Sequence, residues 1–167
     1  MLSYDDVRAT RETMSLRITP ELCDINGHFT VRHQVGVHDD AAWDLLGTLG
    51  MGIDQVAHGA SFFDVEQHLR YLAEAVSGEV VSAHHRLLDV SSSSVHFMSY
   101  LVLPDRAAIV STFECLLLAV DLGSRGMRRF SADELERLIE RTLQDRALGW
   151  DAGACGAMGV RRSALAD

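Results

Sequence analysis

The fold of this chain depends on residues 24–49, which read DINGHFTVRHQVGVHDDAAWDLLGTL. Apolar side chains recur here at roughly helical spacing and predict an amphipathic helix from about residue 32 to residue 49: Val35, Ala42, Leu45, Leu46 and Leu49. The segment 24–28 places a carboxylate, an amide, a glycine and an imidazole just ahead of that helix. Two interpretations are open: a site where a ligand meets helix amides, or a turn in which Asp24 caps the helix.

Length and composition are those of one globular domain. The 167 residues, 47% hydrophobic and 23% charged, are enough to bury a core. No apolar run approaches the roughly 18 residues that span a bilayer, and the N-terminus lacks a signal-peptide core. We therefore expect a cytoplasmic protein with no membrane partner. The net charge of −9 argues against nucleic acid as a partner. The three cysteines, Cys23, Cys115 and Cys155, form no Cys-x-x-Cys pair, so a disulfide scaffold and a zinc ribbon are both disfavoured.

An antiparallel sheet is predicted around the helix. Segment 61–74 alternates Phe63, Val65, Leu69 and Tyr71 with polar residues, so we expect one apolar and one polar face. Segment 107–121 is apolar on both faces apart from Glu114, so we expect the helix to cover one face and a partner subunit the other. Short turns, including the serines 91–94, favour antiparallel pairing. The expected strands are 14–19, 61–74, 79–90, 95–103 and 107–121, with a loop at 53–60.

The two ends complete the expected organisation. Residues 1–13 are polar and predict an N-terminal arm, either a short helix or loose chain. Ser131 and Glu134 form a capping box that predicts a C-terminal helix ending by Gly149. The glycine-containing residues 150–167 predict a flexible tail. The fold class is therefore α+β, with one domain at 14–149 in which a curved antiparallel sheet of about five strands wraps a long central helix.

Seven short motifs carry a resemblance to a known family: Asp24-x-x-Gly27-His28, Asp39-Asp40-Ala41, Glu66-x-His68-x-x-Tyr71, Arg86-Leu87-Leu88, Val95-His96, Thr112-x-Glu114 and Val120-Asp121. Over roughly residues 15–135 the chain resembles the hot-dog-fold acyl-CoA thioesterases of the 4-hydroxybenzoyl-CoA thioesterase type. It is most similar to the betainyl-CoA thioesterase modules associated with carnitine dehydrogenase. The resemblance implies a hot-dog fold, a homodimer or homotetramer, and hydrolysis of a small or polar acyl-CoA to free acid and CoA without a cofactor.

The resemblance also implies roles for individual residues. Asp24 would be the general base or nucleophile, and the Val31 amide would bind the oxyanion. Asn26 either orients the water or caps the turn, and His28 is either catalytic or structural. Predicted substrate-binding residues are Thr30, His33, Gln34, Asp40, Glu66 and His68, of which Thr30, His33 and Gln34 depart from the family pattern. Asp40 has an alternative as solvated helix surface, and Arg70, Arg86, Arg128 and Arg129 are candidates for the CoA phosphates.

Other chemistries are less well supported. We expect no metal site, because His28, His33 and His38 are each rotated by about 140° from the last on a helix and so do not converge. Ser91–Ser94 lacks the context of a nucleophile elbow. Glu114 needs a partner if buried, and His68 or His96 would supply one. Two alternatives to the thioesterase are a hot-dog hydratase or dehydratase acting on enoyl or hydroxyacyl thioesters, and a non-catalytic acyl-CoA-binding protein.

Overall fold

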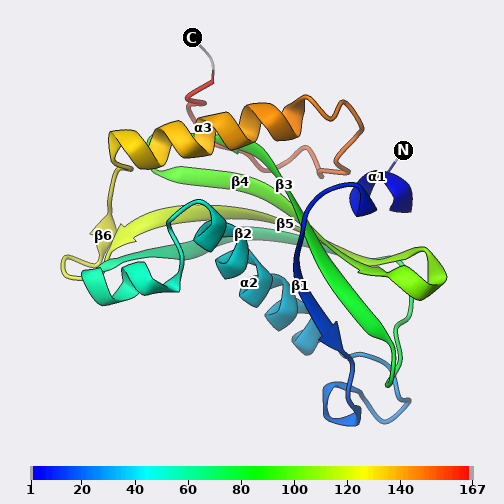
Figure 1. Ribbon diagram of the computed structural model, residues 1–167. Helices are drawn as coiled ribbons and strands as arrows, with labels where there is room; N and C mark the ends of the chain where they lie inside the picture. Colours follow the sequence, from blue (N-terminus) through cyan, green and yellow to red (C-terminus); the bar gives the residue numbers. More distant parts are fainter. Residues whose placement is uncertain (1, 166–167) are drawn as a thin grey trace.

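One antiparallel sheet organises the protein, whose computed structural model describes residues 2–165. The strand order is β1-β3-β4-β5-β2, and the short β6 pairs with β5 (Figure 1). The bounds are β1 Glu12–Arg17, β2 Ala60–Tyr71, β3 Val80–Val90, β4 Ser94–Leu103, β5 Ala108–Asp121 and β6 Gly126–Met127. The predicted curved sheet of about five long strands around a long helix is confirmed.

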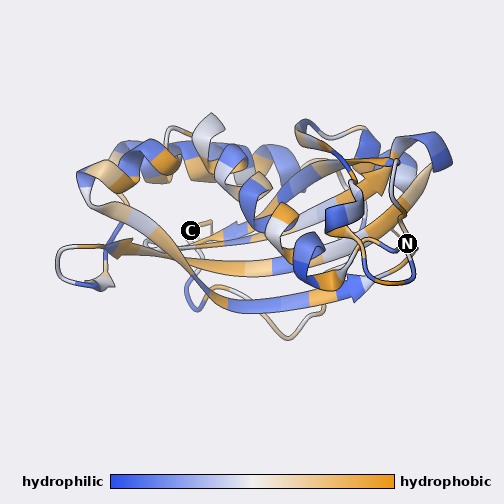
Figure 2. Cartoon of the chain, turned by 90° about the horizontal axis from the view of Figure 1, so that it is seen from below, coloured by the Kyte–Doolittle hydropathy of each residue, from blue (hydrophilic) through white to orange (hydrophobic). Residues whose placement is uncertain are grey.

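Helix α2 (Val31–Thr48) packs its apolar stripe against the concave face of the sheet. Leu45 and Leu46 are buried there among side chains of β4 and β5, and each contributes on the order of 2 kcal/mol through removal from water. Helix α3 (Ala132–Arg146) lies on the same side of the sheet (Figure 2). It begins with the predicted capping box, and the Arg137 Nε donates to the Leu49 carbonyl at 2.7 Å. Both predicted helices are therefore present.

Four short elements complete the chain: α1 (Tyr4–Arg8), and the 3-10 helices η1 (Pro20–Leu22), η2 (Ile53–His58) and η3 (Pro104–Arg106). The loop expected at 53–60 is thus mostly a helix, closed by Gly59 at φ 82°. In the N-terminal arm, α1 buries Val7 against the outer face of the sheet beside β4. No helix among the described residues is long and apolar enough to cross a membrane.

A β-bulge in β2 overturns the predicted single alternation of that strand. The register with β5 shifts between Asp64 and Glu66, so one extra residue separates the two halves of the strand. Paired residues share a face, and the pairs Asp64–Leu117 and Leu69–Phe113 therefore turn Asp64 and Leu69 toward the concave side. Phe63 pairs with Leu118 and faces outward instead. The prediction that Phe63 and Leu69 lie on the same face of the strand was therefore wrong.

The chain's own tail covers part of the outer face, where a flexible tail and a partner subunit were expected. Trp150 and Ala152 pack against Met98 and Tyr100 of β4, and the Tyr100 hydroxyl donates to the Ala152 carbonyl at 2.8 Å. Near the end, the Ala164 amide donates to the Val90 carbonyl at 2.7 Å. These contacts correct the tail prediction for residues 150–165, while residues 166–167 lie outside the described residues.

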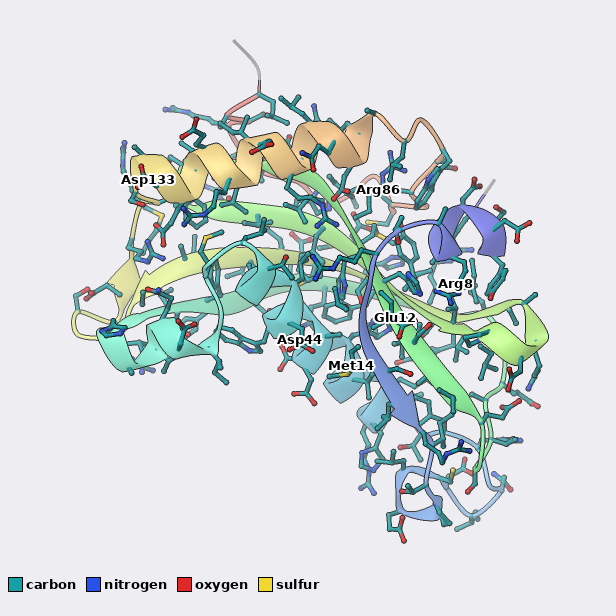
Figure 3. The ribbon with its side chains drawn as sticks, in the orientation of Figure 1. Arg8, Glu12, Met14, Asp44, Arg86 and Asp133 are labelled. Atoms are coloured by element: carbon teal, nitrogen blue, oxygen red, sulfur yellow. The ribbon has the colours of Figure 1, made fainter. Side chains whose placement is uncertain are left out.

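Arg86 and Arg128, two of the candidates for CoA phosphates, serve internal contacts. Arg86 is buried beside the end of α3, where its Nε donates to the Asp145 carbonyl at 2.9 Å and its guanidinium stacks on Trp150 (Figure 3). Arg128 forms a two-pronged pair with Glu134 at 2.8 and 2.9 Å. Neither guanidinium is available to a phosphate without loss of these contacts.

His38 is a core histidine. Its Nδ1 lies 2.8 Å from Ser99 Oγ and its Nε2 lies 3.0 Å from Ser111 Oγ, so one hydroxyl donates and the other accepts. Complete burial lowers the pKa of His38 to about 3, which keeps the imidazole neutral at physiological pH. The residue joins α2 to β4 and β5 rather than binding a ligand.

Candidate active site

The Asp24 turn is held by its own backbone and side chain. Asp24 Oδ1 accepts hydrogen bonds from the amides of Asn26 at 2.8 Å and His28 at 3.0 Å. The Gly27 amide donates to the Asp24 carbonyl at 3.0 Å, and Gly27 adopts a φ of 78°, which glycine reaches without strain. The other carboxylate oxygen, Oδ2, accepts no hydrogen bond from residues 2–165, and the residue is exposed. The aspartate caps its turn and still has one oxygen free for chemistry.

The same hydrogen bonds set the charge of Asp24. The hydrogen bond from the His28 amide is the largest influence on the pKa of Asp24 and lowers it; desolvation opposes this effect, and the Asn26 amide adds to it, so that the pKa is lowered overall. The carboxylate is therefore ionised at neutral pH, as either a nucleophile or a base requires. Among the described residues, the partner of the His28 ring is Glu74, whose Oε2 lies 3.7 Å from the His28 Nε2. The backbone of His28 forms an isolated β-bridge with Val76.

Helix α2 begins directly beyond this turn with free amides. Thr30 is the N-cap residue, but its side chain makes no capping hydrogen bond. The Thr30 carbonyl receives the amides of His33 and Gln34, whereas the amide of Val31 finds no acceptor among residues 2–165. First-turn amides carry the positive end of the helix dipole. The predicted oxyanion donor, Val31, therefore has the donor group that the prediction requires.

Thr30 and Gln34 leave two buried oxygens without partners at this helix end. Thr30 Oγ1 and Gln34 Oε1 have no hydrogen-bond partner among the described residues, although the Gln34 Nε2 donates to the Phe29 carbonyl at 2.9 Å. Unpaired buried polar atoms are costly, and functional sites are one of the places where they occur. His33 and Asp40, the other predicted binding residues on α2, are less enclosed; the Arg32 Nε lies 3.3 Å from the His33 ring nitrogen, and Asp40 is exposed.

A pocket of about 330 Å³ opens between α2 and the first half of β2. Three aromatic residues border it, Trp43, Phe62 and Phe63, and the Trp43 and Phe62 rings meet edge to face with centroids 6.3 Å apart. Two carboxylates, Asp39 and Asp64, also line it, and neither forms an ion pair with a described Lys, Arg or His. Burial, Asp64 and Asp40 together raise the pKa of Asp39. The pocket thus combines aromatic faces with uncompensated negative charge.

The residues Asp39, Trp43, Phe62 and Asp64 were not predicted as site residues. Asp39 was noticed only as part of a family motif, and Asp64 was assigned to the polar outward face of its strand. The bulge after Asp64 turns that side chain toward α2, and the sequence carries no local signal for it. A charged residue next to an aromatic pair, as in Phe62-Phe63-Asp64, was the available hint.

Glu66 and His68 lie away from both the Asp24 turn and this pocket. They share the outer face of β2, as their spacing predicts, because Glu66 pairs with Leu116 and His68 with Glu114 of β5. Glu114 is fully buried and accepts a hydrogen bond from the His96 Nε2 at 2.9 Å. The expected partner for Glu114 is thereby confirmed. The structure brings Asp24, Asn26, His28, Thr30, Val31 and Gln34 to one end of α2 and leaves Glu66 and His68 on the opposite side of the sheet.

Strand β2 is an edge strand with exposed apolar side chains. It pairs with β5 on one side only among the described strands. Val65 and Tyr71 are about half exposed, and Leu72 just after the strand is similarly exposed. The Asp24 turn lies next to the Tyr71 end of β2. Phe29 follows the turn and Ala75 follows the strand, and the Phe29 amide donates to the Ala75 carbonyl at 2.8 Å. An uncovered edge of this kind is a template for pairing with another chain.

Comparisons with known proteins agree with this architecture. A sequence model of the thioesterase-like superfamily matches residues 18–146. The chain is 28% identical over 149 residues to a betainyl-CoA thioesterase of Pseudomonas aeruginosa, covering 89% of this chain and 94% of that relative. It is also 28% identical over 160 residues to a Rhizobium protein named L-carnitine dehydrogenase/betainyl-CoA thioesterase, covering 95% of this chain and 32% of the relative. The chain spans about a third of the length of that second relative.

Solved structures share the fold. A Staphylococcus aureus protein solved in complex with CoA aligns with a TM-score of 0.76 at 17% identity, covering 85% of this chain and 90% of its own. A 1,4-dihydroxy-2-naphthoyl-CoA thioesterase from Synechocystis aligns with a TM-score of 0.67 at 10% identity, covering 76% and 94%. At these identities the likeness establishes the fold alone, and it confirms the predicted fold class. Since the family match spans most of its length, the chain belongs to the thioesterase-like superfamily, as its motifs predict.

Proposed function

We propose that this chain is an acyl-CoA thioesterase whose catalytic carboxylate is Asp24. The observation that carries the proposal is that an ionised carboxylate and the Val31 amide lie at one end of α2 in a member of the thioesterase-like superfamily, and that one oxygen of the carboxylate and the amide have no partner among the described residues. A thioester bound at this helix end would have its carbonyl oxygen near the Val31 amide and its carbonyl carbon near Asp24. Thioester hydrolysis needs these two functions.

The reaction follows one of two routes from this geometry. In the first, Asp24 Oδ2 takes a proton from water while the water oxygen adds to the carbonyl carbon. In the second, Oδ2 itself adds to that carbon, and water later hydrolyses the mixed anhydride. In both routes the negative charge that develops on the carbonyl oxygen meets the Val31 amide. In both routes this tetrahedral intermediate collapses as the C–S bond breaks and CoA leaves as the thiolate. In the first route that step gives the free acid, and in the second it gives the mixed anhydride that water then hydrolyses. Asn26, on the same turn, would orient the water.

A homodimer formed along β2 would complete the site. A two-fold axis pairs an edge strand antiparallel with its copy, so the Tyr71 end of one strand lies beside the Ala60 end of the other. The Asp24 turn adjoins the Tyr71 end, whereas the aromatic pocket lies at the Ala60 end. Within one chain, Asp39 is about 12 Å along α2 from Val31 at 1.5 Å per residue. Pairing therefore offers the catalytic turn of one copy a pocket on the other.

The acyl group that fits this pocket is small and cationic. The relatives named betainyl-CoA thioesterase act, by their names, on a quaternary ammonium acyl group, and its nitrogen is only two bonds from the carbonyl carbon. Within one chain, the distance of about 12 Å between Val31 and Asp39 is too long for that acyl group to span. Aromatic faces and carboxylates are the partners that quaternary ammonium ions favour, and Trp43, Phe62, Asp39 and Asp64 supply them. The unpaired oxygens of Thr30 and Gln34 are available to the thioester end or to water.

Substrate charge provides a prediction for this pocket. Betainyl-CoA and the neutral isostere tert-butylacetyl-CoA have the same shape, so their kcat/KM ratio measures the recognition of charge. We expect wild type to prefer betainyl-CoA, and Asp64→Asn to reduce that ratio by about tenfold or more, since an ion pair near a surface is worth a few kcal/mol before solvent screening. Asp54→Asn, an exposed aspartate on η2, is the matched control. An unchanged ratio in Asp64→Asn would exclude this pocket as the acyl site.

Thiol release distinguishes the thioesterase from its two rivals. Purified protein is mixed with a panel of acyl-CoA substrates, and free thiol is followed with a chromogenic disulfide while enoyl absorbance is followed in parallel. We expect thiol release with no change in enoyl absorbance. A hydratase or dehydratase would change the enoyl absorbance without releasing thiol, and a binding protein would show acyl-CoA binding by calorimetry without turnover. Either result would contradict the proposed reaction.

A further inference from the structure

A cluster of metal-ligating side chains lies on the outer face of the sheet, opposite α2. It joins His68 of β2, Glu114 of β5 and Cys155 of the tail, whose side-chain donor atoms all lie within 4.8 Å of one another. His96 of β4 adjoins it through the hydrogen bond from its Nε2 to Glu114 Oε1. Four segments that are far apart in the sequence therefore converge at one point, and none of these residues serves the Asp24 site.

Glu114 is the centre of the cluster. Its side chain is completely buried, and a carboxylate in that setting needs compensation for the water it has lost. Its two oxygens have different surroundings: Oε1 is taken by His96, whereas Oε2 accepts the Cys155 amide at 2.7 Å and faces the His68 Nδ1 at 3.9 Å. No described Lys or Arg forms an ion pair with it. Oε2 is the oxygen directed toward the other two donors.

The tail holds Cys155 in place by contacts of its own. Gly153 and Gly156 both adopt a φ of 77°, and they turn the chain on either side of Cys155. The Ala157 amide lies 3.4 Å from Cys155 Sγ and donates to it. Upstream, Trp150 and Ala152 fix the segment against Tyr100. The segment that carries the sulfur is therefore held on the sheet by packing outside the cluster, in addition to the bond between the Cys155 amide and Glu114.

The donor set and its spacing suit one class of ion. Around a tetrahedral Zn²⁺ with bonds of about 2.0–2.3 Å, neighbouring donor atoms are roughly 3.3–3.8 Å apart. The donor atoms lie within 4.8 Å of one another, so only a small inward movement is needed to reach these distances. The side chains of Cys155, which is exposed, and His68, which is half exposed, have room for that movement. Imidazole, thiolate and carboxylate together favour Zn²⁺ or a similar transition metal, whereas Mg²⁺ and Ca²⁺ favour all-oxygen sites.

We propose that His68, Glu114 and Cys155 form a site for a divalent transition-metal ion of the zinc class, with His96 orienting Glu114 and water in the fourth position. The ion neutralises the buried carboxylate and clamps residues 150–157 across the outer face of β4 and β5. This function is structural and separate from thioester hydrolysis, since the Asp24 turn lies on other elements. The expectation of no metal rested on His28, His33 and His38. His68 and Glu114 lie 46 positions apart and Glu114 and Cys155 lie 41 positions apart, so only the fold brings these three residues together.

Cobalt substitution tests the site in the full-length, tag-free protein. After dialysis against a chelator, Co²⁺ is added and the absorption spectrum is recorded. We expect one Co²⁺ per chain with a thiolate-to-metal charge-transfer band, displaced by Zn²⁺. Cys155→Ser should abolish the band and His68→Asn should weaken Zn²⁺ binding by more than the 10–100-fold typical of outer-shell changes. His96→Gln, as such an outer-shell change, should weaken it by about 10–100-fold.

Two matched variants control for other donors. Cys23→Ser and His58→Asn remove a cysteine and an exposed histidine from outside the cluster, and both should bind Co²⁺ as wild type does. Circular dichroism of each apo variant verifies that it is folded. The proposal is overturned if wild type shows no thiolate band, if the band persists in Cys155→Ser, or if it is lost in Cys23→Ser. A hydrogen-bonded cluster without a metal would give the first of these results.

Discussion

Replacement of Asp24 by asparagine is expected to lower kcat for thioester hydrolysis by at least about a hundredfold, the scale on which an acid, base or nucleophile acts. Asparagine keeps an oxygen in the position of Oδ1, so the hydrogen bonds from the Asn26 and His28 amides survive. It removes the charge and the basicity of the free oxygen. The substitution therefore separates the capping role of Asp24 from its chemical role.

The measurement is steady-state thiol release by Asp24→Asn and wild type at equal concentration, together with thermal unfolding of both. We expect an unfolding midpoint within a few degrees of wild type. Asp133→Asn is the matched control, since Asp133 is an exposed aspartate in the first turn of the other long helix (Figure 3). Its activity should equal that of wild type. Turnover by Asp24→Asn near the wild-type rate would remove Asp24 from the mechanism.

Restoration of activity by mixing two inactive chains is the second expected result. If the Asp24 turn of one copy works with the aromatic pocket of the other, Asp24→Asn damages one half of each site. Asp39→Arg damages the other half, because a guanidinium in the pocket repels a cationic acyl group by several kcal/mol at an effective dielectric constant near 20. Each variant alone has two damaged sites. A mixed pair has both defects in one site and none in the other.

The helices and strands were predictable because their signals are local. The spacing of Leu45, Leu46 and Leu49 sets the buried stripe of α2, and the capping box at Ser131 sets the start of α3. Gly27 and the carboxylate of Asp24 in one short segment likewise predict a tight turn. The sequence left open whether Asp24 caps the turn or reacts. The structure shows that Oδ1 makes the capping bonds and that Oδ2 accepts no hydrogen bond from the residues that are described.

The features that were missed depend on contacts between distant residues. The bulge after Asp64 follows from the register with β5, so the direction of the Asp64 side chain could not be read from alternation. The packing of the tail depends on Trp150 and Cys155 meeting β4 and β5. Its glycines, taken alone, predict flexibility, whereas here Gly153 and Gly156 provide turns within an ordered segment. Arg86 was a surface candidate by type and is buried by the same tail.

The sharing of one site between two copies of the chain can be tested by a single rate of thiol release. Asp24→Asn and Asp39→Arg chains with different affinity tags are co-expressed, the mixed pairs are isolated by tandem purification, and thiol release from betainyl-CoA is measured. We expect each mixed pair to show about half of the wild-type rate, because one of its two sites is intact, whereas each parent variant loses a hundredfold or more. A mixed pair no more active than its parents would contradict it, because the turn and the pocket would then not be shared between copies.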